Sequence, residues 1–129
     1  MKRVLLFVVV GIAVLATLGG AVAYAQDTSI VNIPFKFTVN KQTMMPGKYE
    51  VRVQDATVIA VVPEKGQPVL TPTITRLAQQ QTLRDATLVF DRVGDAYYLS
   101  EVWMPTMDGY LITDTRQAHQ HHVIKGTKK

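Results

Sequence analysis

The sequence predicts an all-β domain, a single antiparallel β-sandwich or small β-barrel of about six to seven short strands, after an N-terminal signal helix. Two observations predict this fold class: apolar residues recur at every second position in several segments, and turn residues such as Pro46-Gly47 and Gly94-Asp95 separate those segments. The chain has 129 residues and no cysteine. A single core must therefore hold the domain without disulfides.

The first 25 residues have the pattern of a secretory signal peptide. Met1-Lys2-Arg3 carries positive charge, residues 4–18 form an apolar run, and Ala23-Tyr24-Ala25 fits the small-x-small rule of signal peptidase. We therefore expect cleavage before Gln26 and a periplasmic or extracellular location. An uncleaved membrane anchor is the alternative, because about 20 apolar residues suffice to span a bilayer. Both alternatives place the domain outside the cytoplasm.

The chain is expected to have three parts. Residues 1–25 form the signal peptide, residues 26–116 the all-β domain, and residues 117–129 a polar tail, rich in histidine and lysine, that frays. The formal charge falls from +4 to +2 when Lys2 and Arg3 leave with the signal. A charge this small gives no argument for nucleic acid as a partner.

The first half of the domain is expected to consist of strands and turns. Alternation over residues 33–39 and 49–53 predicts two strands with one buried face each, and the β-branched run 58–62 predicts a strand covered on both faces. Pro34 cannot donate to a ladder, so it places the first strand at an edge or marks its start. Residues 75–84 suit either a short helix or a surface loop.

The clearest unit is a hairpin over residues 87–104. With Gly94-Asp95 at the two central turn positions, Val93 faces Ala96 and the register continues outward. One face then gathers Leu88, Phe90, Tyr97, Leu99, Glu101 and Trp103, and the other gathers Val89, Tyr98 and Val102. Both faces are apolar enough to be partly covered, which favours a sandwich. Residues 110–112 are expected to form the last strand.

The three histidines, His119, His121 and His122, are the candidate metal ligands. Clustered imidazoles bind Zn, Cu or Ni outside the cell, and this chain offers no thiol. In a strand His119 and His121 share a face, whereas in a helix His119 and His122 do. Either arrangement supplies two ligands, so a third such as Asp114 would be needed. The alternative is a solvated polar tail.

A second set of residues forms a candidate binding surface. It comprises Tyr97, Tyr98, Glu101, Trp103 and Tyr110. Aromatic side chains line ligand grooves and partner-binding patches, but they also fill the cores of small β domains. A carboxylate buried among aromatic rings can act as a general acid. No nucleophile, base or second carboxylate can be placed beside Glu101, so no catalytic residue is predicted.

Three aspartates, Asp91, Asp95 and Asp108, are interpreted as turn residues. Aspartate is common in turns because its side chain bonds to nearby backbone groups. No segment offers the closely spaced oxygen ligands that a calcium loop needs. No cofactor-binding motif is present either, so no cofactor is expected.

Three segments carry a resemblance that extends from Ile33 to Trp103. They read Ile33-Pro34-Phe35-Lys36-Phe37, then Met45-Pro46-Gly47-Lys48-Tyr49-Glu50-Val51, then Leu88-Val89-Phe90-Asp91-Arg92-Val93-Gly94-Asp95 leading into Tyr97-Tyr98-Leu99-Ser100-Glu101-Val102-Trp103. Together with the signal peptide, they resemble a group of short exported acidobacterial proteins of uncharacterised function. These motifs are turns and core strands. The resemblance therefore implies the fold and carries over no catalytic residue.

Two functional hypotheses follow from the sequence. The first is a non-enzymatic envelope or secreted module with a binding or structural role, whose partner is an envelope protein, an extracellular protein or a small ligand. The second is a small-ligand or metal carrier that uses a cavity between the sheets or the three histidines. An enzyme is not expected, and contact with the membrane is expected only through an uncleaved signal segment.

Overall fold

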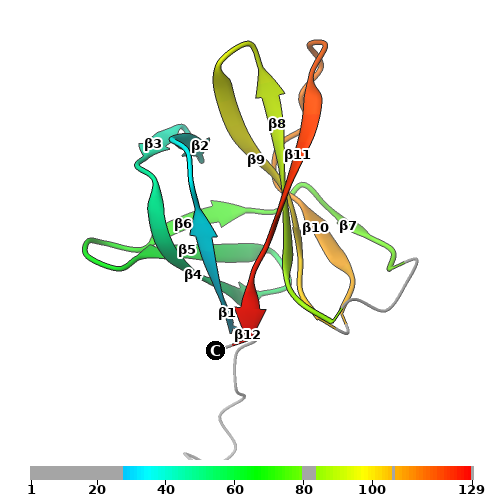
Figure 1. Ribbon diagram of the computed structural model, residues 1–129. Coiled ribbons are helices and arrows are strands. Elements are labelled where there is room, and N and C mark those ends of the chain that lie inside the picture. The colour runs from blue at the N-terminus through cyan, green and yellow to red at the C-terminus, as the bar shows by residue number, and fades with distance from the viewer. Residues whose placement is uncertain (1–27, 80–83, 106, 129) are drawn as a thin grey trace, which may run out of the picture.

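The computed structural model describes residues 28–79, 84–105 and 107–128, which form two packed β-sheets and contain no helix (Figure 1). The predicted all-β sandwich is thus confirmed. The expected signal segment, residues 1–25, lies outside the described residues. Sheet A has the strand order β12-β1-β4-β5-β6. Its strands are β1 (Thr28–Ile33), β4 (Gly47–Asp55), β5 (Val58–Pro63), β6 (Val69–Pro72) and β12 (Thr127–Lys128).

Sheet B has the order β11-β8-β9-β10-β7, and β2 joins it through β9. Its strands are β2 (Phe37–Val39), β3 (Gln42–Met44), β7 (Thr75–Leu77), β8 (Thr87–Val93), β9 (Ala96–Trp103), β10 (Gly109–Leu111) and β11 (Gln120–Lys125). Neighbouring strands are antiparallel except for the β2–β9 contact, where Thr38 pairs with Tyr98 in parallel. Residues 75–77, expected in a helix or a loop, instead form β7 and pair with β10.

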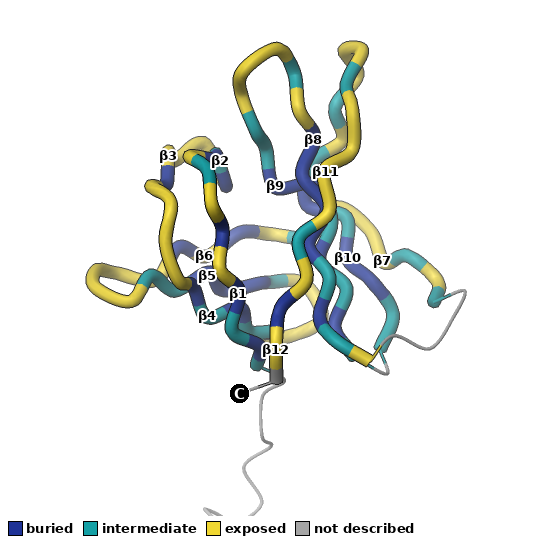
Figure 2. Tube along the Cα trace, viewed as in Figure 1, coloured by how far each residue is buried: buried dark blue, intermediate teal, exposed yellow. Residues whose placement is uncertain are grey.

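The core lies between the sheets and continues through most strands (Figure 2). Its largest fully buried side chains include Tyr110, Phe37, Phe90, Ile33, Ile59, Leu88, Leu99 and Met104. Three consecutive residues of β5, Ile59, Ala60 and Val61, are buried, as the β-branched run predicts for a central strand. The tip of the β8–β9 hairpin projects beyond this core and is largely exposed (Figure 2). The β2–β3 hairpin is exposed at its turn, whereas its buried side chains Phe37, Val39 and Met44 belong to the core.

The single strand expected over residues 33–39 is divided between the two sheets. Ile33 ends β1 in sheet A, Phe37 begins β2 in sheet B, and both side chains are buried in the core. Pro34 lies between them, where its missing N–H ends the ladder and lets the chain change sheets. The alternating pattern is continuous across this point because both segments face the same core.

The predicted β8–β9 hairpin forms with the expected turn, but its register changes midway. Val93 pairs with Ala96, and Gly94 has a φ of 60°, as the first central residue of a type II′ turn requires. Phe90 pairs with Leu99 but Val89 pairs with Glu101, so Ser100 is an extra residue in β9. Such a bulge turns every later side chain to the opposite face.

The expected faces beyond this bulge are therefore wrong. Val102 and Met104 point into the core and are fully buried, whereas Glu101 and Trp103 lie on the outer face of sheet B and are half-buried. A regular hairpin register places Glu101 and Trp103 with Phe90 and Leu99. The bulge at Ser100 reverses this placement.

The end of the chain is not a frayed tail. It forms β11, which pairs with β8 in sheet B, and then β12, which pairs with β1 in sheet A. We call residues 120–128 the C-terminal strap; it runs from the top of Figure 1 to its base. Gly126 lies between the two strands, where its N–H donates to the carbonyl oxygen of Ala86 at 2.8 Å. The β domain thus continues well beyond residue 116.

Candidate metal centre and aromatic groove

Asp91 is a buried, charged side chain of β8 that directly follows three buried apolar residues. Its side chain is only 2% exposed. Its Oδ1 atom is buried and accepts no hydrogen bond from the described residues. Leaving a buried acceptor without a partner costs about 1–3 kcal/mol, and more for a charged group. Asp91 is therefore the strongest indication of a functional site in the described chain.

Two imidazoles approach Asp91 from the C-terminal part of the chain. The β8–β11 register places His121 opposite Asp91, with His121 Nδ1 3.2 Å from Asp91 Oδ1. His119, just ahead of β11, has its Nε2 atom 3.6 Å from the same oxygen. Neither contact has the geometry of a hydrogen bond, and each is an ion pair when the imidazole is protonated. Strand pairing thus gathers three donor atoms within 4.8 Å of one another.

The ring of His119 is held in a defined orientation. Its Nδ1 atom lies 2.7 Å from the carbonyl oxygen of Gln117. Because a carbonyl oxygen can only accept, Nδ1 carries a proton and donates it. In the neutral imidazole the lone pair is then on Nε2, the nitrogen that lies near Asp91. A histidine that binds a metal is commonly oriented by such a bond from its other nitrogen.

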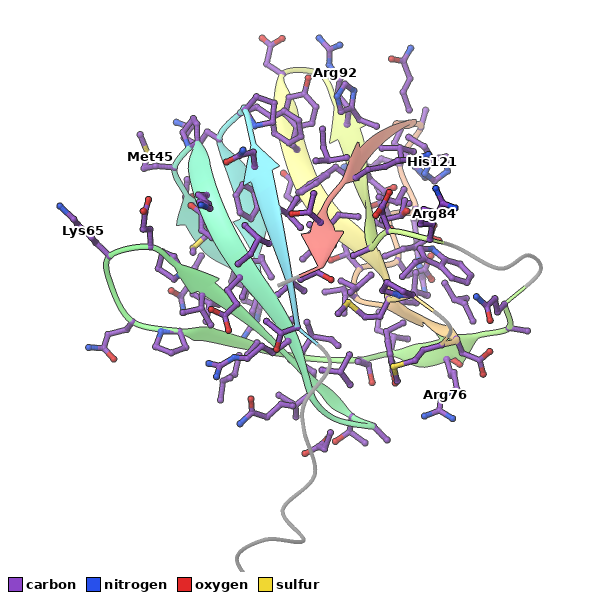
Figure 3. All side chains as sticks on the ribbon, turned by 60° about the horizontal axis from the view of Figure 1, so that its bottom comes forward. Met45, Lys65, Arg76, Arg84, Arg92 and His121 are labelled. Carbon is purple, nitrogen blue, oxygen red and sulfur yellow. The ribbon has the colours of Figure 1, made fainter. Side chains whose placement is uncertain are left out.

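The separations of the two nitrogens from Asp91 Oδ1 suit a single metal ion. Two ligands of a tetrahedral ion with bonds of about 2.1 Å lie about 3.4 Å apart. The two separations from Asp91 Oδ1, 3.2 and 3.6 Å, lie on either side of that value. Two imidazole nitrogens and one carboxylate oxygen suit Zn²⁺, Cu²⁺ or Ni²⁺. Figure 3 shows that the side chain of His121 points outward from sheet B.

His122 and Asp114 lie apart from this cluster. His122 pairs with Phe90, and its ring makes edge contacts with Phe35 and Tyr97 at centroid distances of 5.3 and 5.7 Å. Asp114 is exposed and is no member of the three-residue group. Of the predicted ligands, the structure therefore brings together His119 and His121.

The third member of this group, Asp91, is not the turn residue that the sequence predicts. Asp91 lies two residues before the end of β8, directly after three buried apolar side chains. A charge directly after an apolar run of a strand was the signal available. It did not indicate that His119 and His121 would lie beside it.

On the outer face of sheet B, Glu101 and Trp103 hold each other in place. The indole Nε1 of Trp103 donates to Glu101 Oε1 at 2.8 Å. The Trp103 ring also covers Gly109, where a Cβ atom would lie 2.5 Å from Trp103 Cδ2. Glu101 therefore has a neutral hydrogen-bond partner on a partly solvated face.

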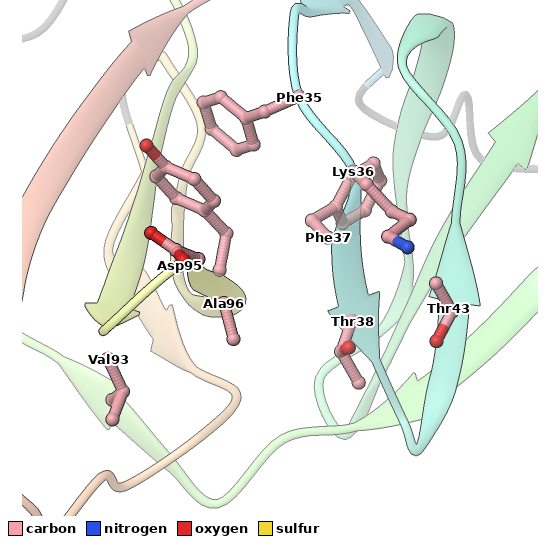
Figure 4. A pocket seen from close by; sticks show the side chains of 9 residues that line it. Phe35, Lys36, Phe37, Thr38, Thr43, Val93, Asp95 and Ala96 are labelled. Carbon is pink, nitrogen blue, oxygen red and sulfur yellow. The ribbon is translucent and has the colours of Figure 1, made fainter.

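Tyr97 is the member of the predicted binding surface that lines a groove. Its ring stacks on Phe35 with centroids 3.9 Å apart and planes at 16°. The groove, of about 560 Å³, runs between the β8–β9 tip and the β2–β3 hairpin (Figure 4). Lys36 and Asp95 add one charge of each sign to its lining.

The two remaining tyrosines have different environments. Tyr98 pairs with Asp91 across the β8–β9 ladder and is half-buried on the outer face. Tyr110 is fully buried, with the Arg76 guanidinium 5.7 Å from its ring centroid. Tyr110 thus belongs to the core, whereas Tyr98 flanks the candidate metal centre.

Comparisons with family models, with curated proteins and with solved structures find no match for this chain. Within the described ranges, none of the elements is a helix of the length and apolar character needed to cross a membrane.

Proposed function

We propose that this protein is an exported, non-enzymatic β-sandwich module that binds a divalent transition-metal ion through Asp91, His119 and His121. The main support is the buried Asp91 Oδ1 atom, which lacks a hydrogen-bond partner yet lies 3.2 and 3.6 Å from two imidazole nitrogens. An ion among these three atoms would satisfy the carboxylate and occupy both lone pairs. Export is supported by the N-terminal sequence pattern alone.

The chemistry of the donor atoms limits which metal ions can bind to the site. Imidazole binds Zn²⁺, Cu²⁺ and Ni²⁺ well, whereas Ca²⁺ and Mg²⁺ prefer sites built of oxygen atoms. Among the first three ions, a nitrogen and oxygen site binds Cu²⁺ most tightly. We therefore expect affinity in the order Cu²⁺ above Ni²⁺ and Zn²⁺, with no competition from Ca²⁺.

The proposal is tested by isothermal titration calorimetry, in which each ion is titrated into the purified protein. The protein is used in the form in which the expressing cell produces it. We expect one ion per chain. Asp91→Asn, His119→Ala and His121→Ala should each raise Kd at least about tenfold, a loss of about 1.4 kcal/mol of binding free energy. Circular dichroism of each variant would establish that the fold is retained.

His122→Ala is the matched control, because His122 lies in the same short segment but on the opposite face of sheet B. It should leave Kd within about twofold of the wild type. An equal loss of affinity in His122→Ala, or no loss in Asp91→Asn, would show that the ion binds to a histidine-rich segment without a built site.

The groove beside Tyr97 favours a second candidate function, the binding of a partner or small ligand without an ion. Its aromatic wall of Phe35 and Tyr97, with a lysine and an aspartate in the lining, has the mixed character of a ligand groove. A thermal-shift screen with metal chelated throughout tests this function separately. A shift that disappears in Tyr97→Ala but persists in Asp91→Asn would assign it to the groove.

A further inference from the structure

The candidate metal centre has fewer protein donors than a closed site. Within the part of the chain that the structure describes, Asp91, His119 and His121 form a group in which each residue offers one ligand atom. Structural zinc sites have four protein ligands, whereas sites that react or exchange have three and leave a position for water or substrate. Two histidines with one carboxylate, arranged around open positions, form a recurrent donor set of the second kind.

The three donors leave one side of the ion toward solvent. The side-chain exposure rises from 2% at Asp91 through 21% at His119 to 57% at His121. The protein thus encloses the ion from the carboxylate side, and the remaining positions lie on the imidazole side at the surface. His122 cannot fill them because its ring is turned to the opposite face, against Phe35 and Tyr97.

The phenol of Tyr98 is a further protein group close to the site. Tyr98 pairs with Asp91 across the ladder, so its side chain leaves the same face of sheet B. A phenol oxygen is a possible metal ligand, and it would convert an open position into a closed one. Tyr98→Phe removes that oxygen while keeping the ring.

We infer that the bound ion keeps a coordination position open to solvent, and that a small donor ligand, such as an imidazole or a monoanion, binds there. This inference rests on the proposed metal-binding function. An incoming donor can then attach before a protein ligand leaves, so the ion can pass to another carrier by ligand exchange.

The test uses the full protein loaded with Cu²⁺ and titrated with azide, a monoanion whose bond to Cu²⁺ produces a new charge-transfer absorption. Equilibrium dialysis before the titration measures the copper content. We expect one copper per chain and a saturable azide band in wild type, Tyr98→Phe and His122→Ala alike. Dialysis afterwards should recover the copper still bound.

Each other outcome has a distinct meaning. Copper at one per chain with no azide band overturns the open position and leaves metal binding intact. A band that appears only in Tyr98→Phe shows that Tyr98 closes the site, which also overturns the inference. Loss of copper from the protein during the azide titration also overturns the inference, because azide then replaces the protein ligands instead of occupying an open position. Failure to bind copper at all rejects the proposed function itself.

Discussion

The Asp91 carboxylate and the His121 imidazole face each other across the β8–β11 pair, with Oδ1 and Nδ1 3.2 Å apart. Asp91 lies in a buried strand, whereas β11 is an edge strand whose side chains are exposed except for the half-buried Ile124. An ion between Asp91 and His121 would therefore tie a weakly packed edge to the core of sheet B.

Metal binding is expected to slow amide hydrogen exchange in β11. An ion at about 100 times its Kd stabilises the bound state by about 2.7 kcal/mol, which slows exchange through openings that break the site about a hundredfold. The amides of β6, at the far edge of sheet A, should open without disturbing the site and keep their rates. The measurement is exchange followed by NMR or mass spectrometry, with and without Zn²⁺.

Asp91→Asn serves as the control for this effect, because it weakens the site without changing β11. Protection of β11 by Zn²⁺ should disappear in that variant. Equal protection in the variant, or protection confined to β6, would show that the ion stabilises the chain from another place.

Gly109→Ala is expected to destabilise the domain by about 1–3 kcal/mol, the usual range for overpacking. The new Cβ would lie 2.5 Å from Trp103 Cδ2, so the indole must move and its bond to Glu101 must lengthen or break. Urea unfolding followed by circular dichroism measures the loss. Trp103 is the sole tryptophan, so its emission reports the ring's displacement directly.

A double-mutant cycle separates this clash from any backbone effect of alanine. In a Trp103→Val background there is no indole above position 109, and the same substitution should cost much less. An equal cost in both backgrounds would mean that the strand β10 requires glycine for a reason other than Trp103.

Tyr49→Phe is expected to lower stability at neutral pH by about 1 kcal/mol. The Tyr49 hydroxyl donates to the carbonyl oxygen of Met45, at the entry to β4, and the substitution removes that bond. Burial also raises the pKa of Tyr49, so the folded state keeps its proton at a pH where the unfolded chain loses it. The stability that this proton contributes is complete below the unfolded pKa of about 10 and is lost as pH rises above it.

The wild type should therefore lose stability between neutral pH and pH about 10.5, and Tyr49→Phe should lose less over the same range. Urea unfolding at both values measures the difference between the two proteins. A gap that stays constant or widens with pH would contradict the assignment of Tyr49 as a buried, protonated donor.

Much of the fold was predictable because its signals are local. Alternation identified the strands around Phe37 and Val51, and Gly94-Asp95 identified the hairpin turn that the structure contains. Two local errors followed from the same reasoning. Pro34 divides what alternation shows as one strand, and the bulge at Ser100 changes the register without altering the apolar pattern of β8.

The candidate site was only half predictable. The spacing of His119 and His121 predicted that they share a face if the segment is a strand. In the structure His121 lies in β11 and His119 lies just ahead of it, and both approach Asp91. Their third partner was sought nearby in the sequence, at Asp114, whereas it lies 28 positions before His119 in β8. Proximity along the chain was a poor guide because the contact is made between strands.

The sequence by itself determined the all-β class and the positions of most turns, because each depends on residues close together in the chain. Only the tertiary structure decided that the last residues form the strap, that β11 pairs with β8, and that Asp91 meets His119 and His121. The pairing of distant strands depends on which apolar faces pack into one core, and a shift of one residue would turn Asp91 away from both histidines. That choice is made by the whole domain, so no local pattern in the chain contains it.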